Sequence, residues 1–136
     1  MNMSRVRRLG FIFALTTLVA GIGGAQALAG DRWLESRPCG PDSLKGPLRL
    51  LIPQGAFGAD FRQACRRHDA CYDTPGANRA ACDARFLDDM LCSCASSRHP
   101  ALCRMTARIM HRATAKNGEE AFRSAQAIAM QQLAAE

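Results

Sequence analysis

The apolar residues of this chain recur with the period of an α-helix, and the alternation typical of β-strands is nearly absent. A first helix is predicted to start near Asp60, a residue type that favours the N-cap, and to end before Thr74-Pro75-Gly76. A second helix is predicted from about Asn78, with an apolar stripe of Phe86, Leu87, Met90, Leu91 and Cys94. Because only a short loop joins them, the two helices are expected to run antiparallel.

Two more segments of helical periodicity follow towards the C-terminus. Leu102, Met105, Ile109 and Arg112 share a helical spacing that Lys116-Asn117-Gly118 ends, and Phe122, Ala125, Ile128, Ala129 and Leu133 lie on one side of a last segment. Both are interpreted as core-packing helices, because their polar sides lack the Lys/Arg enrichment of a helix that lies on a membrane. The sequence therefore predicts an all-α domain.

An apolar patch, residues 48–52, precedes the first helix and is interrupted by Arg49. Large apolar side chains in a small domain belong more often to the core than to the surface. We therefore predict burial for Leu48, Leu50, Leu51, Ile52, Phe57 and Phe61.

The N-terminal 29 residues have the three parts of a signal peptide. Arg5, Arg7 and Arg8 are basic, residues 11–20 form an apolar run too short to span a membrane, and Ala27-Leu28-Ala29 matches a cleavage site. Cleavage after Ala29 would leave a single domain, residues 30–136, that is exported to the periplasm or secreted.

All seven cysteines lie after this segment. In a small exported chain such a number indicates a disulfide framework, and an odd count leaves one thiol free or paired with another molecule. The alternative is zinc bound by Cys65, His68 and Cys71. On a helix, however, Cys71 points away from the face that Cys65 and His68 share, which favours disulfides.

The net charge of the chain bears on whether lipid headgroups or nucleic acid are suitable partners. It falls from +6 to +3 on cleavage, because the signal segment holds three basic residues and no acidic ones. A charge of this size gives a mild attraction to anionic surfaces such as lipid headgroups. No run of Lys/Arg is present of the kind that tracks nucleic acid, so a nucleic-acid partner is not expected.

One face of the first helix carries unusual chemistry, since Cys65, His68, Asp69 and Tyr72 fall at helical spacing. On the second helix Asp83 shares the apolar side, where a carboxylate is costly unless it is hydrogen-bonded or paired. A disulfide joining the two helices after His68 would bring Asp83 towards the imidazole, with Tyr72 in reach. A His–Asp pair without a nearby nucleophilic Ser or Cys is typical of a base that activates water.

Asp69 points to the same region beside His68. One carboxylate together with backbone carbonyls of a Gly/Pro loop is a suitable calcium site, and a Cys39–Cys65 disulfide would place the loop at residues 40–43 next to Asp69. A metal ion at that position polarises an ester or amide carbonyl. The spacing thus predicts calcium-assisted hydrolysis of a carbonyl compound.

These residues also carry a family resemblance. The sequence Cys-x-x-His-Asp-x-Cys at residues 65–71 resembles the active-site helix of secreted phospholipases A2, and Cys82-Asp83 resembles the Cys-Asp step of their second long helix. Residues 57–69 are most similar to the small bacterial and fungal members. The likeness covers roughly residues 39–103.

The resemblance implies a small disulfide-linked helical domain in which two antiparallel long helices carry the active site. It implies that His68 is the base, that Asp83 orients it, that Tyr72 supports Asp83 and that Asp69 binds Ca²⁺. The implied carbonyl ligands are Pro38, Gly40 and Asp42. The implied disulfides are Cys39–Cys65, Cys71–Cys82 and Cys94–Cys103, which leaves Cys92 as a free thiol.

The activity implied is hydrolysis of the sn-2 acyl ester of glycerophospholipids by a monomer acting at a phospholipid membrane or micelle surface. In such a site the same six apolar residues predicted to be buried, Leu48, Leu50, Leu51, Ile52, Phe57 and Phe61, would also suit an acyl-chain slot. Two alternatives remain: a non-catalytic lipid-binding or toxin-like module on the same scaffold, and a structural cystine-rich helical protein. The presence of His68, Asp69, Tyr72 and Asp83 together favours the enzyme.

Overall fold

The computed structural model of the chain describes residues 37–41, 44 and 46–135, which belong to one compact unit that starts at Arg37. The predicted signal peptide, residues 1–29, and the predicted ligand Asp42 lie outside the described residues. Within the described part, no helix is long and apolar enough to cross a membrane.

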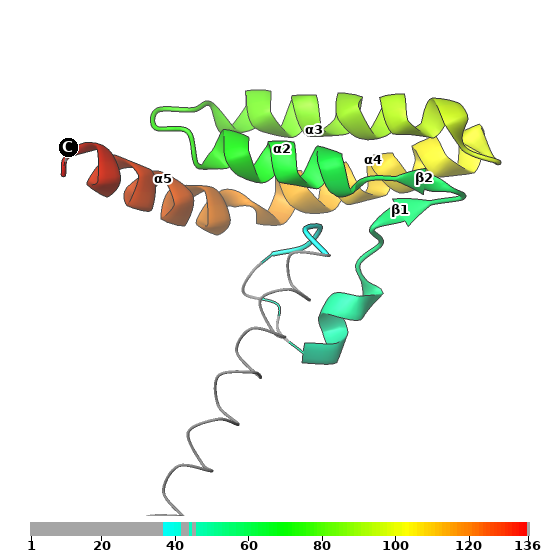
Figure 1. Ribbon diagram of the computed structural model, residues 1–136, viewed down its shortest axis with the longest axis horizontal. Helices are drawn as coiled ribbons and strands as arrows, with labels where there is room; N and C mark the ends of the chain where they lie inside the picture. The colour runs from blue at the N-terminus through cyan, green and yellow to red at the C-terminus, as the bar shows by residue number, and fades with distance from the viewer. Residues whose placement is uncertain (1–36, 42–43, 45, 136) are drawn as a thin grey trace, which may run out of the picture. The chain divides into compact units, whose positions relative to one another are not determined.

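The described residues confirm the all-α prediction (Figure 1). Four α-helices make up most of this part of the chain, and two very short strands form a hairpin that precedes the helices in the sequence. In chain order the elements are η1 (Gly46–Leu51), β1 (Gly55–Ala56), β2 (Ala59–Asp60), α2 (Arg62–Tyr72), α3 (Arg79–Ser93), η2 (Cys94–Ser96), α4 (Pro100–Asn117) and α5 (Glu119–Leu133).

The helices α2 and α3 run antiparallel side by side, joined by the loop at one end (Figure 1). Helix α4 returns along α3, and α5 follows α4 after the single residue Gly118 and reaches back to α2. The core between these helices is built on the fully buried Phe61 and Met90 and on cystine sulfurs. The arrangement presents the inner faces of α2 and α3 to each other.

The helix boundaries differ little from those predicted. Helix α2 begins at Arg62 because Asp60 is engaged in the hairpin, where it pairs with Gly55 and its carboxylate accepts a hydrogen bond from the Arg62 N–H at 2.9 Å. Helix α3 begins after Asn78, whose side chain accepts from the Ala81 N–H at 3.0 Å as an N-cap should.

The predicted burial of the patch at 48–52 is wrong for its leucines. Leu48, Leu50 and Leu51 are exposed, whereas Arg49 is only 4% exposed. The reason is that the Arg49 guanidinium donates to the carbonyls of Pro41 at 3.1 Å and Arg37 at 3.3 Å, which turns its side of η1 inwards. Phe57 is exposed as well, and Ile52 is half-buried. Among the predicted core residues of this region, Phe61 is fully buried.

The prediction of which α4 residues face the core is also wrong. Leu102, Met105 and Ile109 are exposed, and the buried side carries Cys103 and Ala107. The disulfide from Cys103 to Cys94 fixes this rotation, because residues one position apart on a helix point about 100° apart.

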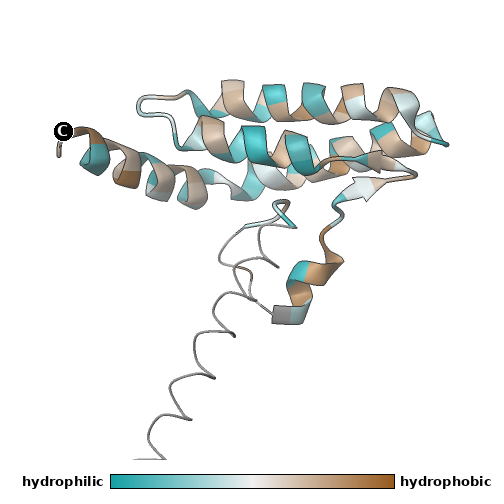
Figure 2. Cartoon of the chain, in the orientation of Figure 1, coloured by the Kyte–Doolittle hydropathy of each residue, from teal (hydrophilic) through white to brown (hydrophobic). Residues whose placement is uncertain are grey.

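On α5 the prediction that the apolar residues pack in the core is confirmed for some of them and wrong for others. Ala129 is buried and Phe122 is half-buried, but Ile128 and Leu133 are exposed. Figure 2 shows apolar and polar residues alternating along these helices, so that apolar residues lie on both their inner and outer sides.

Candidate active site

Three disulfides hold the helices in register, and they are the three that the family resemblance implies. Their Cα–Cα distances are 5.2 Å for Cys39–Cys65, 5.7 Å for Cys71–Cys82 and 5.6 Å for Cys94–Cys103. Cys92 is an exposed free thiol, as expected. Because Cys65 and Cys71 are both oxidised, neither offers a thiolate, and the zinc alternative at these residues is excluded.

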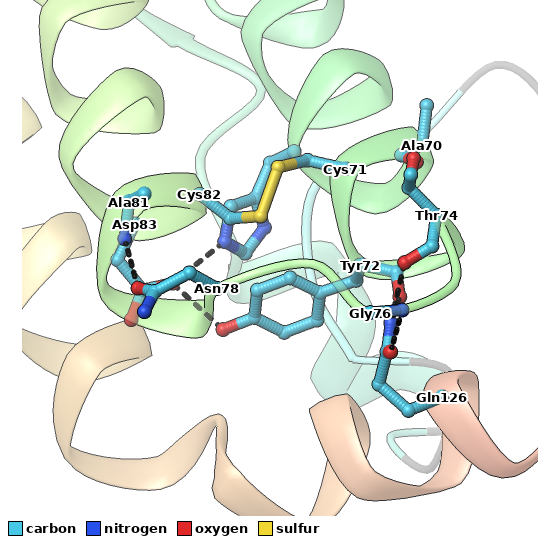
Figure 3. Close-up of a disulfide and its surroundings, with 11 residues drawn as sticks. Ala70, Cys71, Tyr72, Thr74, Gly76, Asn78, Ala81, Cys82, Asp83 and Gln126 are labelled. Atoms are coloured by element: carbon cyan, nitrogen blue, oxygen red, sulfur yellow. Dashed lines mark hydrogen bonds and ion pairs between the residues drawn. A yellow bond between two sulfur atoms is a disulfide. The ribbon is translucent and has the colours of Figure 1, made fainter.

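The Cys71–Cys82 disulfide clamps α2 to α3 next to a buried polar cluster (Figure 3). His68 Nε2 lies 2.8 Å from Asp83 Oδ1, and the Tyr72 hydroxyl donates to the same oxygen at 2.7 Å. Exposed fractions of 8% for His68, 4% for Asp83 and 6% for Tyr72 show that water is largely excluded. The structure thus brings together the three residues that the sequence placed on facing helices.

The His68 ring packs against two aromatic rings. Tyr72 lies 4.2 Å from it between centroids at an angle of 50°, and Phe86 lies 4.7 Å from it at 32°. The imidazole orientation is therefore fixed by packing as well as by Asp83. Because Nε2 faces Asp83, Nδ1 is the ring nitrogen that remains for a water molecule.

The second oxygen of Asp83 faces a residue that the sequence analysis missed. Arg79 Nη1 lies 3.8 Å from Asp83 Oδ2, and Arg79 Nε lies 3.0 Å from Glu119 Oε2 at the start of α5. The spacing of four residues between Arg79 and Asp83 on one helix was the available signal. Burial, and then the hydrogen bond and charge of Asp83, raise the pKa of the Tyr72 phenol well above its ordinary value, so Tyr72 stays a donor.

Helix α5 supports the end of α2 through contacts that have no local sequence signal. Gln126 Nε2 donates to the Tyr72 carbonyl at 2.6 Å and to the Thr74 carbonyl at 2.8 Å, and its Oε1 accepts from the Gly76 N–H at 2.8 Å (Figure 3). Gly118 lies so close that a Cβ there would be 2.9 Å from the Tyr72 hydroxyl oxygen. The phenol is thus enclosed by the junction of α4 and α5.

A pocket of about 390 Å³ opens beside His68 on the outer groove between α2 and α3. Phe86 forms part of its wall, and Arg67 and Arg85 lie at its sides. Arg67 is paired with Asp89 at 3.1 Å, which links the two helices across the groove. A ligand in this pocket would contact the base from one side.

Among the described residues, no group of three or more His, Cys, Asp or Glu side chains is arranged to hold a metal ion. The predicted calcium site does not require such a group, because it uses one carboxylate together with backbone carbonyls. Asp69 follows His68 on the exposed side of α2. The loop that carries Pro38 and Gly40 is attached to the same helix through Cys39–Cys65.

The backbone carbonyls of this loop differ in whether they accept a hydrogen bond. Those of Arg37, Cys39 and Pro41 accept hydrogen bonds from Arg49, from Gln54, and from Leu44 and Arg49 respectively. Those of Pro38 and Gly40 accept none from the described residues. Backbone carbonyls without a hydrogen-bond donor are hard oxygen groups of the kind that calcium binds.

Gly40 is required in this loop for two reasons. Its φ of +113° lies in the region that side-chain-bearing residues avoid. A Cβ at this position would also stand 2.6 Å from Ile52 Cδ1. Asp69, Pro38 and Gly40 offer one carboxylate and two backbone carbonyls, the ligand types that calcium takes, whereas the fourth predicted ligand, Asp42, lies outside the described residues.

No protein-family model, curated protein or solved structure matches this chain. The chemistry of the site therefore has to be inferred from its own geometry and from the resemblance of residues 65–71 and 82–83.

Proposed function

We propose that the protein is an exported, calcium-dependent phospholipase A2 of the small bacterial and fungal type. It hydrolyses the sn-2 acyl ester of a glycerophospholipid and releases a fatty acid and a lysophospholipid. The observation that supports this most directly is the buried contact of His68 Nε2 with Asp83 Oδ1 at 2.8 Å, completed by Tyr72 at 2.7 Å. The arrangement orients one imidazole and leaves its second nitrogen free to accept a proton.

In this mechanism Asp83 holds the His68 ring in the tautomer whose Nδ1 is unprotonated. Nδ1 removes a proton from a water molecule while the water oxygen forms a bond to the ester carbonyl carbon. The imidazolium formed is stabilised by the Asp83 carboxylate. It then returns the proton to the departing glycerol oxygen as the carbon–oxygen bond breaks, which regenerates the base.

The calcium ion would be held by the Asp69 carboxylate and the carbonyls of Pro38 and Gly40, and the resemblance adds Asp42. When bound, Ca²⁺ polarises the ester carbonyl and stabilises the negative charge that develops on its oxygen. The protein's part is to place these donors beside His68. The Cys39–Cys65 disulfide supports this role because it attaches the loop to α2.

Export is supported by the three disulfides, which form and persist in oxidising compartments. We therefore assign residues 1–29 as a signal peptide that is removed on passage to the periplasm or the medium. The mature domain, residues 30–136, acts as a monomer on a phospholipid membrane or micelle surface.

The decisive experiment measures fatty-acid release from phospholipid vesicles with calcium and with a chelator. His68→Gln should lower kcat by about 10²–10⁴-fold, because the general base is lost, while the amide can still reach Asp83. His111→Gln, on α4, is the matched control and should retain activity. Equal rates for the wild type and His68→Gln would refute the assignment of the base.

The metal site has its own test. Asp69→Ala should abolish calcium-dependent release, whereas Asp73→Ala, which removes an exposed carboxylate just after α2, should not. Equal wild-type activity with and without chelator would rule out the calcium site. If the wild type releases no fatty acid but binds vesicles as well as His68→Gln does, the non-catalytic lipid-binding module is the correct alternative.

A further inference from the structure

Helix α4 presents a face to solvent that is both apolar and basic, so the prediction that its polar side lacks Lys/Arg enrichment is wrong. Its large apolar residues Leu102, Met105 and Ile109 are 44%, 54% and 58% exposed. Exposed cations lie between and beside them over three turns. We call this surface the α4 outer face, and it consists of Leu102, Arg104, Met105, Arg108, Ile109, Arg112 and Lys116.

The positive charge of the α4 outer face is not neutralised by the described part of the protein. Between Met90 and Gly118 the sequence holds five Lys/Arg and no Asp/Glu. None of the four cations on α4 forms an ion pair or hydrogen bond with a described residue. By contrast, Arg67 pairs with Asp89 at 3.1 Å, and Arg123 pairs with Glu119 at 2.8 Å.

We propose that the α4 outer face docks the protein on an anionic phospholipid bilayer. Helix α4, about 27 Å long at 1.5 Å per residue, would lie along the surface with its three apolar side chains at the headgroup–acyl boundary. The long Arg and Lys side chains reach outwards to lipid phosphates while their stems stay on apolar surface. This attachment is separate from the His68 site and does not depend on hydrolysis.

The composition of the face argues against two other occupants. A second copy of the chain would bring two sets of unpaired cations together, which is unfavourable at low salt. A nucleic acid would be attracted by the charge, but it gains nothing from exposed Leu, Met and Ile, and α4 offers no Phe, Tyr or Trp on which bases could stack. An anionic bilayer offers phosphates to the Arg and Lys side chains and an apolar interior to Leu102, Met105 and Ile109, so it matches both parts of the face.

The test is sedimentation of the exported, disulfide-intact protein with phosphatidylcholine vesicles that do or do not contain phosphatidylglycerol. A chelator is present throughout, so that no lipid is hydrolysed. We expect tight binding to the anionic vesicles only, weakened by salt. Arg108→Gln with Arg112→Gln should weaken it about 25-fold, at about fivefold for each cation. Met105→Ser with Ile109→Ser should weaken it about tenfold or more.

Two control variants remove the same chemistry elsewhere: Arg62→Gln on α2 and Ile128→Ser on α5, both of exposed side chains. They should bind as the wild type does. Wild-type binding by the α4 variants, or equal losses in the controls, would overturn the proposal. Tighter binding to a duplex DNA fragment than to the vesicles would replace it with a general polyanion surface. A dimer in sedimentation equilibrium that Met105→Ser with Ile109→Ser dissociates would replace it with a self-association surface.

Discussion

Replacing Tyr72 by phenylalanine removes one hydrogen bond from the buried Asp83 carboxylate and leaves the ring in place. The phenol donates to Asp83 Oδ1 at 2.7 Å, and hydrogen bonds to charged groups contribute about 1.5–3 kcal/mol to stability. Asp83 keeps the imidazole at 2.8 Å and the Arg79 guanidinium at 3.8 Å. We therefore expect Tyr72→Phe to lower the free energy of unfolding by about 2 kcal/mol.

The ring itself should not contribute to this loss, because phenylalanine retains the contacts with His68 and with Phe122, whose centroid lies 5.0 Å away. The measurement is thermal and urea unfolding followed by circular dichroism, which requires no activity. A domain of this size shifts its Tm by about 4–8 °C per kcal/mol, so a decrease of about 10 °C is expected. A loss below about 0.5 kcal/mol would mean that Asp83 does not depend on the phenol.

The same pair of proteins gives a pH test. The pKa of Tyr72 is raised above its ordinary value of 10.0, chiefly by burial and then by Asp83, so the folded state holds the phenol proton more tightly than the unfolded state does. The stability difference between the wild type and Tyr72→Phe should be fully present below pH 10 and should decrease as the pH rises above it. A difference that grows above pH 10 would contradict the burial of the neutral phenol.

Two further changes test the packing and the disulfides. Gly118→Ala should destabilise the protein by about 1–3 kcal/mol in urea unfolding, because the new Cβ would lie 2.7 Å from the Thr114 carbonyl oxygen and 2.9 Å from the Tyr72 hydroxyl. The cost of these close contacts exceeds the gain of up to about 1 kcal/mol in helix propensity. The exposed Ser124→Ala is its neutral control, and a stabilised Gly118→Ala would show that the α4–α5 junction is more open. Alkylation of the unreduced protein should label Cys92 alone in peptide mass spectra; label on any other cysteine would refute the disulfide pairing.

The features that sequence could predict are those that depend on local spacing. The boundaries of α2 and α3 follow from periodicity and from the Asn78 cap, and they agree with the structure to within about two residues. The contact of His68 with Asp83 was predictable because two helical faces and one disulfide determine it. Each residue involved lies close in sequence to a cysteine.

Features that depend on distant partners could not be predicted in this way. The contacts of Gln126 join residues fifty or more positions apart, as between Gln126 and Gly76, and nothing in either segment indicates them. The exposure of Leu102 and Met105 follows from the disulfide of Cys103, which overrides the apolar stripe. In the sequence Arg49 interrupts an apolar patch, whereas in the structure its guanidinium donates to the carbonyls of Pro41 and Arg37.

The long-range contacts of Gln126 also affect when the site can form during synthesis. Its hydrogen bonds to the Tyr72 and Thr74 carbonyls join residues 54 and 52 positions apart, so they cannot form until the chain has been synthesised well beyond α2. The Cys71–Cys82 clamp requires an oxidising compartment as well. Before these two contacts form, α2 is tied neither to α3 by the disulfide nor to α5 by Gln126, so the pairing of His68 with Asp83 is completed late in folding.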